Sequence, residues 1–168
     1  KGQSSLLLGG RATYSEWILK SLDEESLKNS QAKFYDGIVK YTHKIGKNNT
    51  IEATGYYSRD AFSISSDSLY KYSNRLVSLK WDHSFNDKSK AALIFTNSEY
   101  QFNIDYRSDN LNAFDFGYKI AETQAMLKMS YQWNKKHKLT YGLSSKLYGI
   151  NPGDFEPKNS ASPLNPVH

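Results

Sequence analysis

The chain has 168 residues, a net charge of +5, 23% charged residues and a mean hydropathy of -0.70. No apolar run approaches the roughly 18–20 residues of a membrane-spanning helix, and the absence of cysteine excludes disulfides and thiolate metal sites. The basic residues form no stripe and no aromatic RNA-binding motif is present, so we expect no nucleic-acid partner.

The first thirty residues combine a strand pattern with a helical one. Residues 3–14 predict a strand, in which Gly9 and Gly10 suggest a bulge or a tight bend. Over residues 15–27, Trp17 and Ile18 lie on one face of a possible helix. This region therefore predicts a strand followed by a loop with a short helix.

Alternation of apolar and polar residues is the main signal beyond residue 30. Even positions from Ala92 to Tyr106 are mostly apolar and odd positions from Asn97 to Arg107 are polar, over about fifteen residues. Strands of soluble proteins average only about 5–6 residues. Similar patterns predict further strands, and the non-alternating run Ile120–Thr123 predicts a bulge. The predicted strands after the first are 33–45, 50–62, 73–85, 90–106, 114–133 and 138–150.

Short and long connections alternate between these strands. Three short polar segments, Gly46–Asn49, Asn86–Ser89 and Asn134–His137, contain residues that tolerate hairpin conformations. Longer connections lie at 63–73 and 107–112. All four prolines follow residue 151, so we expect a sheet over 1–150 and a proline-rich extracellular loop over 151–168. This alternation is typical of outer-membrane barrels, which have short periplasmic turns and long extracellular loops.

The low hydropathy agrees with a membrane barrel, because half of every barrel strand is polar. Aromatic residues recur near the short turns, as in the girdles of barrels; they are Tyr41, Trp81, Phe85 and Trp133. The alternative is that they are core aromatics of a soluble sandwich. The predicted fold class is all-β: a partial antiparallel transmembrane β-barrel of about seven strands.

Candidate site residues are sparse. The three histidines near the turns lack metal-ligand spacing, and no nucleophile elbow or His-Glu-x-x-His motif occurs, so we expect no enzyme activity, metal or cofactor. The charged residues of the polar strand faces are candidates for the barrel lumen. In a soluble sandwich they would instead form a solvated outer face. They are Asp36, Lys40, Glu52, Lys80, Asp82, Glu99, Arg107 and Lys128.

Several of these strands resemble a known family. Two segments are similar to the early barrel strands of TonB-dependent outer-membrane receptors, namely Leu7–Tyr14 and Lys33–Tyr41. Two further segments also fit barrel strands of that family, namely Lys47–Asp60 and Lys136–Gly153. The chain looks like the subgroup with a carboxypeptidase-like regulatory domain, over most of residues 5–157. The resemblance implies energised import of a large or scarce solute across the outer membrane of a Gram-negative cell. It also implies a barrel of about 22 strands, a plug domain and a TonB box.

The resemblance therefore describes a fragment of a larger barrel, since residues 1–168 offer no plug. Its expected partners are outer-membrane lipid, the remaining strands and plug of the parent chain, and TonB or other outer-membrane subunits. One alternative is a barrel scaffold subunit of a larger outer-membrane complex, which a TonB box would argue against. The other is a soluble β-sandwich or lipocalin-like binding protein, which would purify without detergent.

Overall fold

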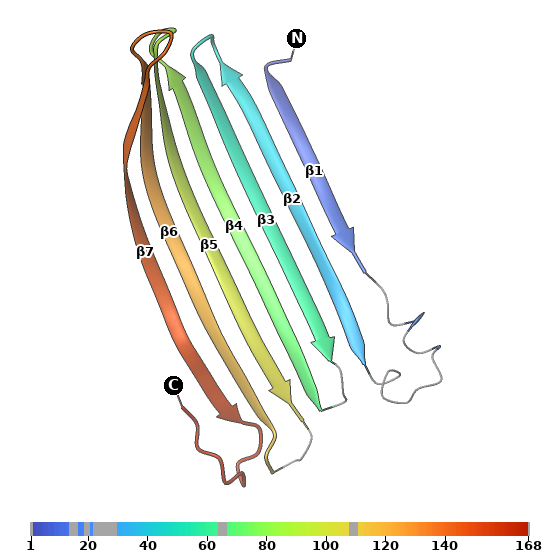
Figure 1. The fold of residues 1–168 in the computed structure, drawn as a ribbon. Helices are drawn as coiled ribbons and strands as arrows, with labels where there is room; N and C mark the ends of the chain where they lie inside the picture. Colours follow the sequence, from blue (N-terminus) through green and yellow to red (C-terminus); the bar gives the residue numbers. More distant parts are fainter. Residues whose placement is uncertain are drawn as a thin grey trace.

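The fold is a single antiparallel sheet of seven strands that follow one another in chain order (Figure 1). The computed structural model describes residues 2–13, 17–18, 21, 30–63, 67–107 and 111–167. Each strand pairs with the next one in sequence. The strands are β1 (Ser4–Ala12), β2 (Gln31–Ile45), β3 (Asn49–Ser63), β4 (Ser68–Ser84), β5 (Ser89–Tyr106), β6 (Phe114–Gln132) and β7 (Lys138–Pro157).

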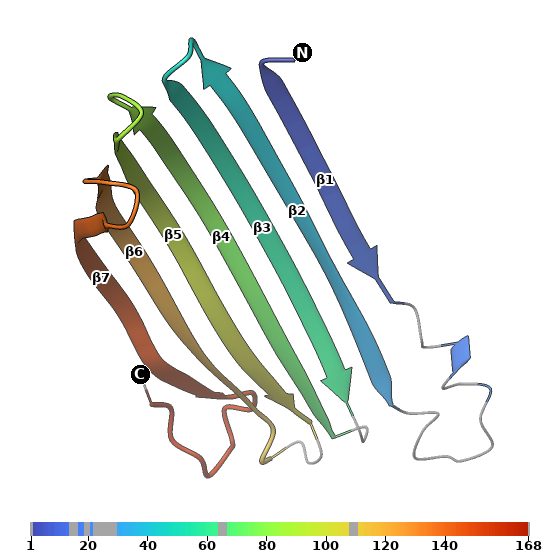
Figure 2. The ribbon, with the colours of Figure 1, turned by 45° about the horizontal axis from the view of Figure 1, so that its top comes forward.

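The sheet is open. Figure 2 shows β1 and β7 at its two ends, and these strands make no contact with each other. The predicted all-β antiparallel architecture of about seven strands is confirmed. Among the described residues, no helix has the length and apolar character needed to cross a membrane. The helical loop predicted near 15–27 lies mostly outside the described residues, which include only Trp17, Ile18 and Ser21 of it.

The three short turns form where their local chemistry favours them. Gly46 adopts a φ of 64°, the left-handed conformation that glycine enters without steric cost. In the next two turns, an asparagine side chain organises the backbone as an Asx turn. The Oδ1 atom of Asn86 accepts hydrogen bonds from the amides of Lys88 and Ser89, and that of Asn134 accepts from Lys136 and His137.

Four local predictions were wrong. β3 extends to Ser63 and β4 begins at Ser68, so most of the longer connection predicted at 63–73 belongs to strands. β1 pairs with β2 in continuous register through Gly9 and Gly10, so no bulge occurs there. Ile120–Thr123 also pairs regularly, and the irregularity of the β6–β7 pair lies beside it, where β7 contains one extra residue opposite Gly117–Lys119. β7 passes through this bulge and ends at Pro157 instead of near Ile150, which an edge strand permits despite its prolines.

The sheet has no hydrophobic core in its described part. Ala113 is the only apolar residue there that is buried, and large apolar side chains such as Leu143 remain 77% exposed. A soluble domain buries such side chains between two packed layers. Here the described residues form one layer, so its apolar surface must be covered by something outside these residues.

Candidate functional site

The pairing register divides the side chains into two faces, because residues directly opposite each other on neighbouring strands point the same way. Leu79 pairs with Ala53 on β3 and with Phe95 on β5, and Leu127 pairs with Leu93 and Leu143. We call the side that carries these residues the leucine face. The opposite side, which carries the residues adjacent to them in sequence, is the lysine face.

Near the short turns, the leucine face is a continuous apolar band. On β4, Val77, Leu79 and Trp81 are exposed while the residues between them on the lysine face are only half-exposed. Its apolar members run from Val77 to Trp81 on β4 and from Ala125 to Tyr131 on β6, in the part of each strand nearest the short turns. Its members on the later strands are Leu93, Phe95, Ala125, Leu127, Met129, Tyr131, Leu139, Tyr141 and Leu143.

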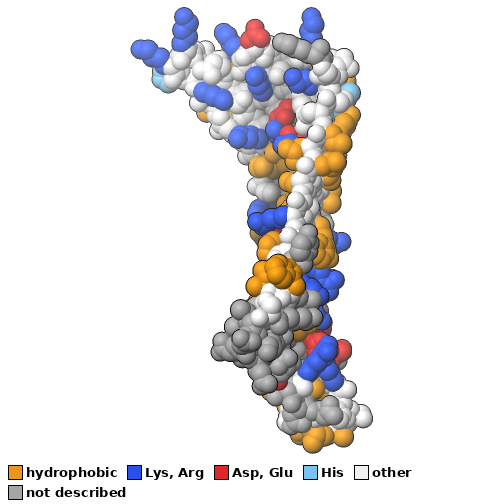
Figure 3. All heavy atoms as spheres, turned by 90° about the vertical axis from the view of Figure 1, so that its right-hand side faces the viewer, with side chains coloured by type: hydrophobic (Ala, Val, Ile, Leu, Met, Phe, Trp, Pro, Cys, Tyr) orange, Lys and Arg blue, Asp and Glu red, His pale blue; other side chains and the backbone are white. Residues whose placement is uncertain are grey.

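The lysine face is charged over the same stretch. Three ion pairs lie there: Lys40 Nζ to Glu52 Oε2 at 3.0 Å, Lys80 Nζ to Asp82 Oδ2 at 2.8 Å, and a third between β6 and β7. The third joins Lys146 to Glu122 at 3.1 Å. Figure 3, viewed from the β1 edge, shows basic side chains on one side near the turns and hydrophobic ones on the other. The sheet curves toward the basic side.

Both faces change character halfway along the strands. Beyond Phe95, the leucine face of β5 continues with Asn97, Glu99, Gln101, Asn103 and Asp105. On the neighbouring strands the same face carries further charged side chains. They are Arg59, Lys71, Arg75, Asp115, Lys119, Asp154 and Glu156. The apolar band therefore ends in a charged zone, on the side of the sheet opposite the short turns.

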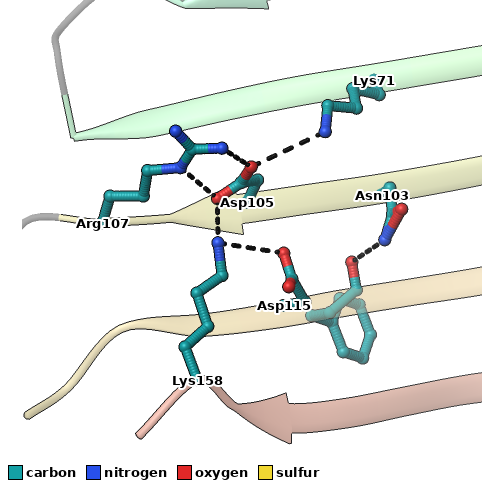
Figure 4. Close-up of polar contacts among 7 residues, drawn as sticks. Lys71, Asn103, Asp105, Arg107, Asp115 and Lys158 are labelled. Carbon is teal, nitrogen blue, oxygen red and sulfur yellow. Dashed lines mark hydrogen bonds and ion pairs between the residues drawn. The ribbon is translucent and has the colours of Figure 1, made fainter. Parts of the chain in front are cut away.

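Asp105 is the centre of this charged zone, beyond the apolar band (Figure 4). Its carboxylate accepts hydrogen bonds from Arg107 Nε at 2.8 Å and Nη2 at 2.5 Å and from the Lys158 ammonium, and Lys71 Nζ lies 3.6 Å away. Hydrogen bonding to Arg107 lowers the pKa of Asp105 well below its usual range, although burial of the carboxyl opposes the shift. The cluster joins β4, β5 and the segment after β7.

On the lysine face, the loop end is aromatic. Rings from β3, β4, β5 and β6 follow one another across the sheet with centroid distances of 5.0 to 5.9 Å. We call this set the aromatic ladder; its members are Phe62, Tyr70, Tyr72, Tyr100, Phe102 and Tyr118. A second run, Tyr106–Phe114–Phe155, reaches β7 with distances of 5.1 and 4.9 Å.

The eight predicted lumen candidates do not share one face. Six of them, Asp36, Lys40, Glu52, Lys80, Asp82 and Lys128, lie on the lysine face. Glu99 lies on the leucine face, where Arg75 contacts it at 3.0 Å, and Arg107 binds Asp105 of that same face. The sequence pattern missed the aromatic ladder because the ladder depends on cross-strand register.

The three turn histidines make local hydrogen bonds. His43 Nδ1 lies 2.6 Å from Ser4 Oγ, His83 Nδ1 lies 2.8 Å from Asn49 Oδ1, and His137 bonds within its own turn. In the described part of the chain, no three histidine or acidic side chains are arranged to hold a metal ion. The absence of catalysis stays a prediction.

The fold is shared with a solved outer-membrane protein structure. No protein-family model and no curated protein matches the chain. The chain is similar to the translocator domain of the autotransporter NalP from Neisseria meningitidis, with 18% identity, a TM-score of 0.51 and coverage of 79% of this chain. It spans 47%, about half, of that structure. A KdgM porin in complex with disordered oligogalacturonate has a TM-score of only 0.13 and supports no argument. The sheet thus matches part of an outer-membrane β-barrel fold.

Proposed function

We propose that the chain is part of the barrel of a TonB-dependent outer-membrane receptor that imports a large or scarce solute. The observation that supports the proposal is the apolar band of the leucine face. Its side chains on β4 are exposed, it carries no charged residue on β4 and β5, and it ends in the charged zone around Asp105. Lipid would cover this band and leave the charged zone in water.

The strand lengths support a sheet that extends beyond the membrane. β5, β6 and β7 contain 18, 19 and 20 residues, about twice what the bilayer requires. The sheet would therefore continue well beyond the membrane on the side opposite the short turns. Both edge strands would need neighbours, because unpaired backbone groups in lipid cost several kcal/mol each. The remaining strands of the parent barrel would supply them.

In this proposal the lysine face lines the lumen and contacts the plug domain of the parent chain. Its curvature toward the basic side and its lower exposure on β4 support this orientation. The short turns would be periplasmic, and the opposite ends of the strands, together with the segment after β7, would be extracellular. The proposal includes no catalytic step, since the described side chains form no catalytic constellation.

The orientation can be tested in the full-length parent protein in intact cells. Single cysteines replace Asp87, in an exposed short turn, and Ser160, in the exposed segment after β7. A membrane-impermeant thiol reagent should label Ser160→Cys and should label Asp87→Cys only after the outer membrane is opened. Labelling of Asp87→Cys alone in intact cells would invert the orientation and contradict the proposal.

A second measurement separates the receptor from a scaffold. The purified full-length parent should bind the periplasmic domain of TonB in detergent with one-to-one stoichiometry. Failure to bind, combined with recovery of the parent only in a stable complex with other outer-membrane subunits, would favour the scaffold.

A further inference from the structure

The charged zone of the leucine face is divided between two groups of strands. Beyond the apolar band, this face of β2, β3 and β4 carries cations and no carboxylate; the cations are Lys33, Arg59, Lys71 and Arg75. The same level of β5, β6 and β7 is mostly acidic and carries Glu99, Asp105, Asp115, Lys119, Asp154 and Glu156. The charge therefore changes sign across the sheet, and the half on β2–β4, which we call the cationic half, borders the apolar band.

Arg59 is the centre of the cationic half. It is exposed, and among the described residues no carboxylate forms an ion pair with it. Lys33 and Lys71 lie diagonally from it on β2 and β4, because Arg59 itself pairs with Tyr35 and Ser73. Diagonal neighbours in a sheet are about 7–8 Å apart, a separation that long side chains can bridge. One anion can therefore reach more than one of these cations.

Lys71 is only loosely engaged by Asp105 (Figure 4). Its Nζ lies 3.6 Å from the carboxylate, whereas Arg107 bonds the same group at 2.8 and 2.5 Å. Beside Lys71 lies a cavity of about 180 Å³, whose lining includes Arg59, Lys71, Ser73, Gln101 and Asn103. Each of these side chains can donate a hydrogen bond. The cavity therefore offers donors and positive charge to an anion.

An apolar groove lies next to this cavity, within the band, and Tyr57 lines both. The groove has a volume of about 620 Å³, and its lining includes Leu8, Gly37, Val39, Gly55 and Val77. The ring of Tyr57 lies 6.0 Å from that of Tyr35, between the groove and the cations. Tyrosine suits such a position because one end of its side chain is apolar and the other is polar.

We infer that the groove and the cationic half together bind a phosphorylated lipid of the outer leaflet. An acyl chain lies in the groove, and the phosphate binds Arg59 and Lys71. Arginine binds phosphate through paired, charge-assisted hydrogen bonds, and the lysine stem can lie along apolar surface while its ammonium reaches the phosphate. The inference rests on the proposed function, because that function places lipid against the apolar band and the outer leaflet at this level.

Other occupants match only one part of this surface. A soluble anion uses the cations but leaves the apolar groove unfilled, and an apolar peptide fills the groove but brings no charge to Arg59. Along the strands the surface changes from apolar groove to tyrosine rings and then to cations. A lipid has its acyl chains, polar linkage and phosphate in the same order, so it satisfies all three parts at once.

The inference is tested with the delipidated full-length parent in detergent, by native mass spectrometry of bound lipid. The probe is dioleoyl phosphatidic acid. One comparison is dioleoyl phosphatidylcholine, which has the same chains on a zwitterionic head group, and the other is glycerol 3-phosphate, which has no chain. Phosphatidic acid should bind at least about 10-fold more tightly than either comparison, as one additional charge-assisted hydrogen bond or a buried chain would provide.

Three substitutions address the two parts of the site. Arg59→Gln and Lys71→Gln should each weaken binding of phosphatidic acid by about 10-fold, because each removes a charge-assisted hydrogen bond. Gly37→Val places methyl groups in the groove and should weaken it by about 3-fold or more. The strand accommodates this change, since Gly37 has no positive φ and the nearest atom to an added Cβ lies 3.9 Å away.

The matched control is Lys119→Gln, which removes the same charge from the same face. Arg59, Ser73, Gln101 and Lys119 pair in succession, so Lys119 lies at the level of Arg59 but three strands away in the acidic half. That separation is about 14 Å, beyond the screening length of physiological salt, so the control should change affinity by less than about 2-fold. Heat-dependent gel migration checks that each variant still forms a barrel.

Four results would each overturn the inference. They are equal affinity for phosphatidic acid and phosphatidylcholine, equally tight binding of glycerol 3-phosphate, unchanged affinity in Gly37→Val, and equal loss in Lys119→Gln and Arg59→Gln. Tight glycerol 3-phosphate would identify a site for a soluble anion instead of a lipid. None of these results alters thiol labelling or TonB binding, so the two proposals fail separately.

Discussion

The turn end and the loop end of the sheet are built on the same strands with opposite surfaces. Near the turns, the leucine face is apolar and the lysine face is charged; near the loops, the leucine face is charged around Asp105 and the lysine face is aromatic. A soluble sheet keeps its apolar side on one face because one core covers it. In this sheet the apolar side chains and the charged ones swap faces between the two ends. This indicates that the surroundings of each face change along the strand, as they would where a barrel emerges from lipid.

The largest expected effect is a charge placed in the apolar band. Leu79→Arg in the full-length parent should destabilise the assembled barrel by about 2–4 kcal/mol, because this position would lie near the bilayer midplane. Gln101→Arg, on the same face but in the charged zone, should be nearly neutral. Urea unfolding in lipid vesicles measures both variants. Equal losses would contradict the change of environment along the leucine face.

The next effect concerns the Asp105 cluster. Asp105→Asn leaves Arg107, Lys158 and Lys71 close together without the carboxylate, and should cost about 1–3 kcal/mol. The control is Asp115→Asn, whose more exposed carboxylate contacts Lys158 at 3.4 Å and should cost less than about 0.5 kcal/mol. Hydrogen exchange of the loop-end backbone should rise in the first variant only.

The stability lost in Asp105→Asn should depend on pH. The pKa of Asp105 is lowered in the folded protein, so its carboxylate stabilises the fold fully above the unfolded pKa of about 3.9. That contribution declines as the pH falls from there toward the lower folded pKa. The difference in thermal midpoint between the parent and Asp105→Asn should therefore stay constant from pH 7 to about pH 5 and shrink below about pH 4. A difference that grows on acidification would refute the role of the carboxylate.

Much of the fold could be predicted from the sequence because strand alternation and turn chemistry are local. The three short turns contain Gly46, Asn86 and Asn134, whose preferences act within a few residues. The change of the leucine face from apolar near the turns to charged near the loops could not be predicted in the same way. In β5, Phe95 and Glu99 point to the same side, and only pairing with Leu79 and Arg75 shows that one face is apolar at one end and charged at the other.

The misplaced bulge has a similar cause. The apolar–polar pattern breaks at Ile120–Thr123, yet these residues pair regularly with Leu147–Ile150. The extra residue lies in β7 near Gly153, whose φ of 145° favours glycine. The break in alternation therefore lies where the faces of the sheet change between apolar and charged. It does not mark an irregular backbone in β6.

A smaller difference is expected between the unfolding free energies lost when each of the two glycines with positive φ is replaced by alanine. Gly153→Ala should cost about 1–3 kcal/mol, because an added Cβ would also lie 2.8 Å from the ring of Phe116. Gly46→Ala, in a turn where nothing lies within 4 Å of the added Cβ, should cost about 1 kcal/mol from the backbone alone. Urea unfolding of the two variants tests this order, and a larger loss at Gly46 would contradict the packing at the bulge.

The smallest effect is expected on the lysine face beside the most sensitive position. Lys80 follows Leu79 and points to the opposite side, where its ammonium contacts Asp82 at 2.8 Å with both side chains partly exposed. A solvated pair of this kind contributes little, so Lys80→Ala should change the unfolding free energy by less than about 0.5 kcal/mol. The same urea series measures it against Leu79→Arg. If Lys80→Ala were as damaging as Leu79→Arg, the lysine face would be packed against an apolar environment, and the assignment of lipid to the leucine face alone would be wrong.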